Sequence, residues 1–144
     1  MFKVNLLLLS FFLISCSGQE PYQPQYNKAL WNKIKENKYS FINFSDLAGP
    51  TWTKVCFLGP YNQSADSTLG FQWKNPPIEN LALLREDSHN MIIFATDFEV
   101  IDAFVQNRSY GDFWQLSGKC LSRDNSRVIQ NTESGGGYVT PSMS

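Results

Sequence analysis

Two apolar runs separated by a short polar turn form the clearest pattern in the chain, in the segment MIIFATDFEVIDAFVQ at residues 91–106. The runs at 91–95 and 100–105 are rich in β-branched and aromatic side chains, which favour strands. Asp97 lies in the TDFE between them and suits a tight turn. The pattern therefore predicts a β-hairpin.

A further strand is predicted in TWTKVCFLGPY at residues 51–61. Alternation along a strand places Cys56 and Leu58 on one face and Val55 and Phe57 on the other. The Gly-Pro pair that follows ends the strand. Because apolar groups occupy both faces, we expect this strand to be central, with Cys56 in the middle of the sheet.

The segment YNKALWNKIKENK at residues 26–38 has helical periodicity. Leu30, Trp31 and Ile34 stand at i, i+1 and i+4, and most other positions are polar. We expect an amphipathic helix of about three turns. Its apolar stripe would pack on a sheet, and binding of a partner is the alternative use of the stripe.

The remaining segments predict only short elements. Ser64 or Asp66 would cap a short helix or turn, whereas Pro76-Pro77 disfavours a helix and a central strand at that point. Short strands are predicted at residues 81–84, 114–123 and 126–130. The helix comes first and no β-α units alternate, so the order favours an α+β fold with an antiparallel sheet of four or five strands.

The N-terminus has one positive charge followed by an apolar stretch. After Lys3, residues 4–14 are apolar except for Asn5 and Ser10, and the small Ser15 follows. This is the layout of a secretory signal peptide. A membrane-spanning helix needs roughly 20 apolar residues, so the stretch is too short to span a membrane.

The segment Leu13-Ile14-Ser15-Cys16 resembles the lipobox of bacterial lipoproteins. The resemblance implies that residues 1–15 are a lipoprotein signal peptide, that the Cys16 thiol receives diacylglycerol, and that the new N-terminus is acylated, for instance with palmitate. An ordinary signal peptide cut near Gly18 and a retained hydrophobic anchor are the alternatives, and both leave Cys16 without a role.

Lipid on Cys16 would hold the protein permanently at a membrane, since each buried CH₂ contributes about 0.8 kcal/mol and three chains are present. Ser17 follows Cys16, and lipoproteins retained in the inner membrane usually carry aspartate there. In a host with two membranes the resemblance therefore implies the periplasmic face of the outer membrane.

Polar segments flank the predicted domain. Residues 16–25 would form the lipidated N-terminus and a flexible tether, because they include two prolines and little apolar surface. Residues 26–131 suffice for a single globular α+β domain. Residues 132–144 include three consecutive glycines and predict a flexible tail.

Cys56 and Cys120 are the two cysteines that remain after Cys16. An exported chain meets an oxidising periplasm, so we expect them to form a disulfide. The bridge would close a loop of about 65 residues, for which chain entropy gives on the order of 4 kcal/mol. Two buried free thiols are one alternative, and a redox site, which usually has C-x-x-C spacing, is the other.

Charge and composition argue against several classes of function. The net charge is −1 without a run of like charges, which disfavours nucleic acid as a partner. His89 is the only histidine and is expected in an exposed loop, so we predict no triad, metal site or cofactor. Asp97, Glu99 and Asp102 are the acids that an enzyme acting on wall polymer would use, although acids are also common in turns.

Aromatic residues make up 15% of the chain, and several fall in predicted loops. They either fill the core of a small domain or form a recognition surface, because Tyr and Trp dominate binding hot spots. The recognition hypothesis assigns partner contact to Tyr61, Tyr110, Phe113 and Trp114.

The segments W-x-K-V-C-F-x-G-P-Y (52–61) and R-x-x-G-D-F (108–113) also resemble segments of uncharacterised small bacterial lipoproteins, which implies a location and no activity. The sequence thus predicts a non-enzymatic envelope lipoprotein that binds a periplasmic protein, in an immunity, inhibitor or assembly role. A wall-acting enzyme and a carrier of a small apolar ligand are the alternatives.

Overall fold

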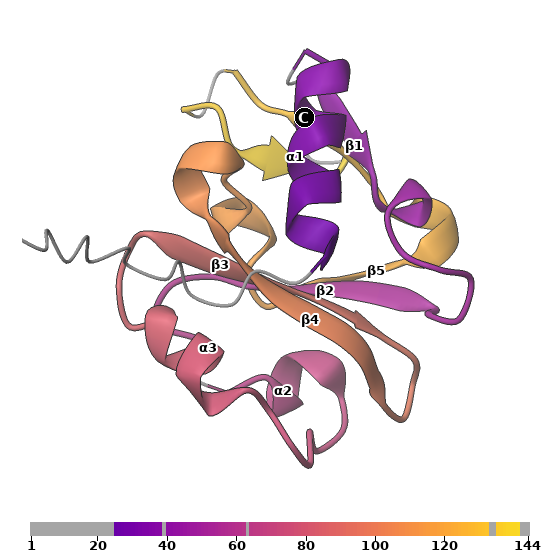
Figure 1. Ribbon diagram of the computed structural model, residues 1–144, viewed down its shortest axis with the longest axis vertical. Helices are drawn as coiled ribbons and strands as arrows, with labels where there is room; N and C mark the ends of the chain where they lie inside the picture. The colour runs from indigo at the N-terminus through magenta and orange to yellow at the C-terminus, as the bar shows by residue number, and fades with distance from the viewer. Residues whose placement is uncertain (1–24, 39, 63, 133–134, 142–144) are drawn as a thin grey trace, which may run out of the picture.

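A computed structural model describes residues 25–38, 40–62, 64–132 and 135–141, with side chains from Lys28 onward. Helices and antiparallel strands are combined in one fold (Figure 1). The expected signal peptide and Cys16 lie outside these residues, as does the tether before Gln25. Within the described part of the chain, no helix is long and apolar enough to cross a membrane.

A four-stranded antiparallel sheet forms the centre of the fold, in the order β4-β3-β2-β5. The strands are β2 (Lys54–Leu58), β3 (His89–Ala95), β4 (Val100–Asn107) and β5 (Cys120–Ser122). β3 and β4 are the predicted hairpin, and β2 is central as predicted. Its residue Cys56 pairs with Ile93 on one side and with Cys120 on the other.

A second, three-stranded antiparallel sheet has the order β1-β6-β7. Its strands are β1 (Phe41–Asn43), β6 (Arg127–Gln130) and β7 (Tyr138–Val139). The fold therefore has two sheets and not the single sheet of four or five strands that we expected. The reason is a 3₁₀ turn at Arg123–Asn125, which directs the chain out of the first sheet after β5 and lets β6 pair with β1.

β7 lies in the segment that composition had assigned to a flexible tail. Tyr138 is buried, its ring stacks on Phe113 with centroids 5.1 Å apart, and its N–H donates to the Asp112 carbonyl at 2.7 Å. Gly135 and Gly136 have φ of 85° and 86°, a conformation that favours glycine. These glycines therefore belong to the turn that leads into a buried strand.

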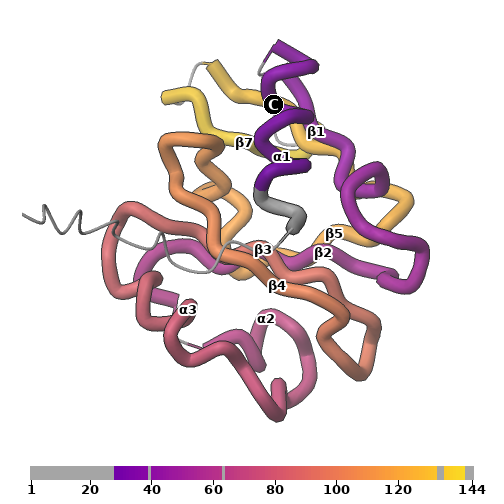
Figure 2. Tube along the Cα trace, in the orientation of Figure 1, coloured from indigo at the N-terminus to yellow at the C-terminus, as the bar shows by residue number. Residues whose placement is uncertain are grey.

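The first helix, α1 (Gln25–Glu36), buries Leu30 and Ile34 completely and leaves Trp31 half-buried. Leu30 and Ile34 pack in one core with Ile42 of β1 and Phe104 of β4. α1 therefore lies over the face of the four-stranded sheet on which the second sheet also lies (Figure 2).

Two short helices, α2 (Asp66–Leu69) and α3 (Ile78–Leu83), cover the opposite face (Figure 1). The strand expected at 81–84 is wrong: the chain is helical through Leu83. Pro77 is the N-cap residue of α3, and Leu81 and Leu84 then lie one turn apart against the core. The expected capping of α2 is also absent, since Ala65 precedes it without a side-chain hydrogen bond.

The four-stranded sheet is consequently buried on both faces. Val55 and Phe57 of β2 join the core under α1 and the second sheet, whereas Cys56 and Leu58 join the core under α2 and α3. Phe57 packs against Phe44 and Phe113 with ring centroids 5.3 and 5.5 Å apart. β2 thus contributes side chains to both cores, one on each side of the four-stranded sheet.

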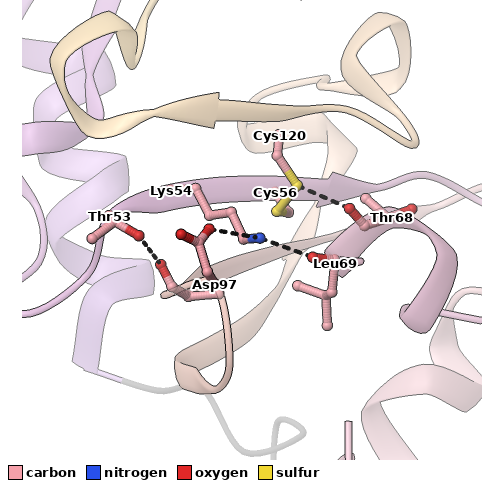
Figure 3. The surroundings of a disulfide bond; sticks show 8 residues. Thr53, Lys54, Cys56, Thr68, Leu69, Asp97 and Cys120 are labelled. Carbon is pink, nitrogen blue, oxygen red and sulfur yellow. Dashed lines mark hydrogen bonds and ion pairs between the residues drawn. A yellow bond between two sulfur atoms is a disulfide. The ribbon is translucent and has the colours of Figure 1, made fainter. Parts of the chain in front are cut away.

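The predicted disulfide between Cys56 and Cys120 is confirmed, and it joins directly opposed positions of β2 and β5 (Figure 3). The Cys120 sulfur lies 3.2 Å from the Thr68 carbonyl oxygen, in the α2 segment. The bridge therefore ties a three-residue edge strand to the centre of the sheet.

We expect Cys56→Ser and Cys120→Ser each to lower the free energy of unfolding by a similar amount, on the order of 4 kcal/mol, because either change reopens a 64-residue loop in the unfolded chain. Urea unfolding of both single variants and the double variant measures this. The double variant should lose no more than the singles, and additive losses would contradict the pairing.

Candidate functional site

Exposed aromatic residues collect at the end of the four-stranded sheet where β2 and β4 finish. Tyr61 follows β2 and is 60% exposed, whereas Tyr110 and Trp114, in the segment after β4, are 44% and 51% exposed. Trp31 of α1 packs on Tyr110 with ring centroids 4.9 Å apart. We call Trp31, Tyr61, Tyr110 and Trp114 the aromatic surface.

Phe113 is not part of this surface, contrary to the prediction from sequence. Its side chain is fully buried between Phe57 and Tyr138. Gly111, with φ of 156°, lets the loop pass so close to α1 that a Cβ there would lie 3.0 Å from the Ile34 Cδ1. The loop then turns inward, and Phe113 enters the core while Trp114 stays outside.

A charged pair holds the loop that carries Tyr110 and Trp114. Arg108 donates from Nε and Nη2 to the two carboxylate oxygens of Asp112, at 2.9 and 2.7 Å, and from Nη1 to the Asp87 carbonyl at 2.8 Å. The Asp112 Oδ1 also accepts the Trp114 N–H at 2.9 Å. Two-point pairing of this kind fixes orientation. The pair therefore sets where Trp114 leaves the loop.

The electrostatics of the pair agree with its geometry. Burial acts to raise the pKa of Asp112, but hydrogen bonds from Arg108 and from the Trp114 N–H, together with the guanidinium charge, outweigh it and lower this pKa. The hydrogen bond to Asp112 raises the pKa of Arg108. Arg108 and Asp112 therefore form a charged pair at the base of the loop that carries Tyr110 and Trp114.

Tyr61 has an unusual backbone conformation, with φ of 64°. The left-handed region is sterically costly for a residue with a bulky side chain. The Tyr61 N–H donates to the Leu84 carbonyl, and this bond ties the turn after β2 to the end of α3. The backbone is thus held in a costly conformation that leaves the ring largely in solvent.

Two buried amides lie behind the charged pair. Asn90 of β3 and Gln106 of β4 are directly opposed, fully buried, and without a hydrogen-bond partner for their side chains among the described residues. The Asn90 amide faces the Asp112 carboxyl and helps to lower its pKa, without reaching hydrogen-bond geometry. Strand alternation puts Asn90 on the same face of the sheet as Ile92, and Gln106 on the same face as Phe104. This alternation was the sequence signal that could have predicted the burial of both amides.

Clefts lined by described residues lie at both ends of the β3–β4 hairpin. The smaller, about 270 Å³, lies between the Arg108–Asp112 loop and the turn at Gly135 and Gly136. The larger, about 690 Å³, is an open groove between the β3–β4 turn and the segment after α2. An open groove does not favour the carrier hypothesis, which needs an enclosed cavity.

The acids proposed for a wall-acting enzyme are not gathered in one cleft. Glu99 lines the larger groove, whereas Asp97 forms an ion pair with Lys54 at 3.5 Å. Asp102 lies on β4 opposite Phe94, accepts the Ala103 N–H at 2.7 Å, and has its pKa raised by burial. This arrangement does not favour a catalytic pair.

His89 is the first residue of β3 and is half-buried, so the exposed loop that we expected for it is wrong. Its Nδ1 lies 2.8 Å from the Ser88 hydroxyl oxygen. Among the described residues, no three His, Cys, Asp or Glu side chains form a group that could hold a metal ion.

No model of a known protein family matches the chain, and neither curated proteins nor solved structures contain a match to it.

We expect Gln106→Met to raise the free energy of unfolding by about 1 kcal/mol, because it replaces an unpaired buried amide by an apolar side chain of similar size. Urea unfolding measures the change, with Gln72→Met on the exposed surface as the control. A loss of stability would mean that the amide has a partner, such as a buried water.

Proposed function

We propose that the protein is a lipid-anchored envelope lipoprotein that binds a protein partner through the aromatic surface, without catalysis. The observation that carries the proposal is the exposure of Tyr61, Tyr110 and Trp114 at one end of the four-stranded sheet, where the Arg108–Asp112 pair holds the loop of the last two. Tyr, Trp and Arg are the residues most enriched among binding hot spots. An immunity, inhibitor or assembly role in the periplasm would use such a surface.

The rigidity of the loops supports binding by a preformed surface. Asp112 fixes Arg108 and the start of the Trp114 turn, and the Tyr61 N–H is bonded to Leu84. Loops that are already ordered lose less conformational entropy when a partner binds. The surface therefore suits recognition of a folded partner without rearrangement.

The N-terminal segment supports the proposed location. Its lipobox-like residues favour Cys16 as the lipid carrier, and Ser17 after it favours the periplasmic face of the outer membrane. The Cys56–Cys120 disulfide agrees with an oxidising compartment. Residues 17–24 then separate the lipid from α1 and would act as the tether.

We expect Cys16→Ala to abolish lipidation, so that an uncleaved precursor or an unlipidated chain accumulates. Membrane fractionation and intact mass spectrometry measure this, and Gln19→Ala, a change in the same N-terminal segment that leaves all three cysteines in place, is the control. The lipoprotein hypothesis fails if the Cys16 variant fractionates and migrates as the native protein does.

We expect Trp114→Ala and Tyr61→Asn to weaken partner capture roughly thirtyfold, which corresponds to about 2 kcal/mol at a hot spot. Asn tolerates the left-handed conformation at residue 61, so this variant should keep its stability. The measurement is quantitative crosslinking from envelope membranes that carry the full lipidated chain.

Phe98→Ala is the matched control for that measurement, because it removes an exposed aromatic at the other end of the β3–β4 hairpin. It should leave partner capture unchanged. Equal capture by wild type and by both aromatic-surface variants, with their folding intact, would overturn the proposed surface.

A further inference from the structure

The larger groove lies at the opposite end of the β3–β4 hairpin from the aromatic surface. One wall is the turn that joins the two strands, and the other is the segment between α2 and α3 (Figure 1). The residues that line it combine rings with hydrogen-bonding groups: Phe71, Gln72, Trp73, Lys74, Asn75, Phe98, Glu99 and Val100. Nothing in the partner-binding proposal uses this groove.

Both walls of the groove are tied to a single ammonium group. Lys54 Nζ donates to the Leu69 carbonyl at 2.8 Å, lies 3.5 Å from the Asp97 carboxylate and 5.5 Å from the centroid of the Phe71 ring. Figure 3 shows this Nζ between Leu69 and Asp97. The Lys54 side chain is only 19% exposed. It therefore sets the distance between the hairpin turn and the segment after α2.

The second wall has an additional support. The Asp66 carboxylate accepts the Trp73 N–H at 2.9 Å, which orders the chain after α2. Phe71 and Trp73 are half-buried and pack on the core under that helix. This wall of the groove is thus preformed, with the rings of Phe71 and Trp73 held in place before any ligand arrives.

The free groups of the groove are of two kinds. Phe98 is 86% exposed at the tip of the hairpin turn, and its ring does not pack in either core. The exposed side chains of Gln72, Lys74 and Asn75 make no hydrogen bond to the described residues. An apolar ring thus stands beside amides and an ammonium that remain available to a ligand.

We propose that this groove binds an oligosaccharide. The C–H-bearing face of a pyranose ring is apolar and slightly positive, so it packs against the negative face of an aromatic ring. Its hydroxyl groups both donate and accept, as do the amides of Gln72 and Asn75. The pairing of rings with such amides in an open groove of about 690 Å³ therefore suits two or more sugar units.

The same features disfavour a protein ligand at this place. Lys and Glu are depleted in protein–protein interfaces relative to the rest of the surface. This groove is open, and four of its eight lining residues are polar, Lys74 and Glu99 among them. A sugar keeps part of its hydration when it binds and so tolerates an open site.

The experiment is isothermal titration of the full mature chain in detergent with cellotetraose and with chitotetraose. We expect weak binding, with a Kd of about 0.1–1 mM, and at least a tenfold loss in Phe98→Ala. Phe98 is nearly fully exposed, so its replacement should leave the fold intact, which circular dichroism checks. Trp114→Ala, on the aromatic surface, is the matched control and should bind as wild type does.

The outcomes separate this site from the proposed partner surface. Binding of both sugars supports recognition of the pyranose itself, and binding of chitotetraose alone supports an N-acetylated glycan. Absence of heat with either sugar at about 10 mM would overturn the proposal. An equal loss in Phe98→Ala and Trp114→Ala would also overturn it, as would loss of protein-partner capture in Phe98→Ala.

Discussion

Burial of one strand on both faces is the constraint on which the rest of this structure depends. β2 directs Val55 and Phe57 to one side and Cys56 and Leu58 to the other, and all four are inaccessible to solvent. Full burial of such a side chain contributes roughly 1.5–3 kcal/mol. Both faces of β2 must therefore be covered, which requires a layer on each side. The second sheet and α1 supply one layer, and the short helices α2 and α3 supply the other.

The same hairpin carries two surfaces of different character at its two ends. Each is held by a charged side chain that contacts backbone as well as a carboxylate: Arg108 with Asp112 at one end, and Lys54 with Asp97 at the other. Partly exposed ion pairs add little net stability. Their main effect here is to fix loop geometry, so the scaffold presents aromatic rings in set positions at both ends.

Several local departures from favourable geometry lie near the aromatic surface, whereas the left-handed Lys38 follows α1 and the indole N–H of Trp52, unpaired within the described part of the chain, precedes β2. Tyr61 adopts a left-handed conformation, and the amides of Asn90 and Gln106 are buried without partners among the described residues. Each departure costs on the order of 1–3 kcal/mol. Natural proteins retain such costs mainly at functional sites. Their proximity to Arg108 agrees with partner binding at this end and has no counterpart in the groove at the other end.

Sequence alone determined the β3–β4 hairpin, the central place of β2 and the Cys56–Cys120 bridge, because alternation along a strand and the pairing of two remaining cysteines need no knowledge of distant contacts. Only the tertiary structure decided that there are two sheets, that Phe113 is buried and that Tyr138 belongs to a strand. β1, β5 and β7 have two or three residues each, so their own propensities are too weak to specify them. Long-range packing stabilises these strands, and it also brings the groove-lining segments together.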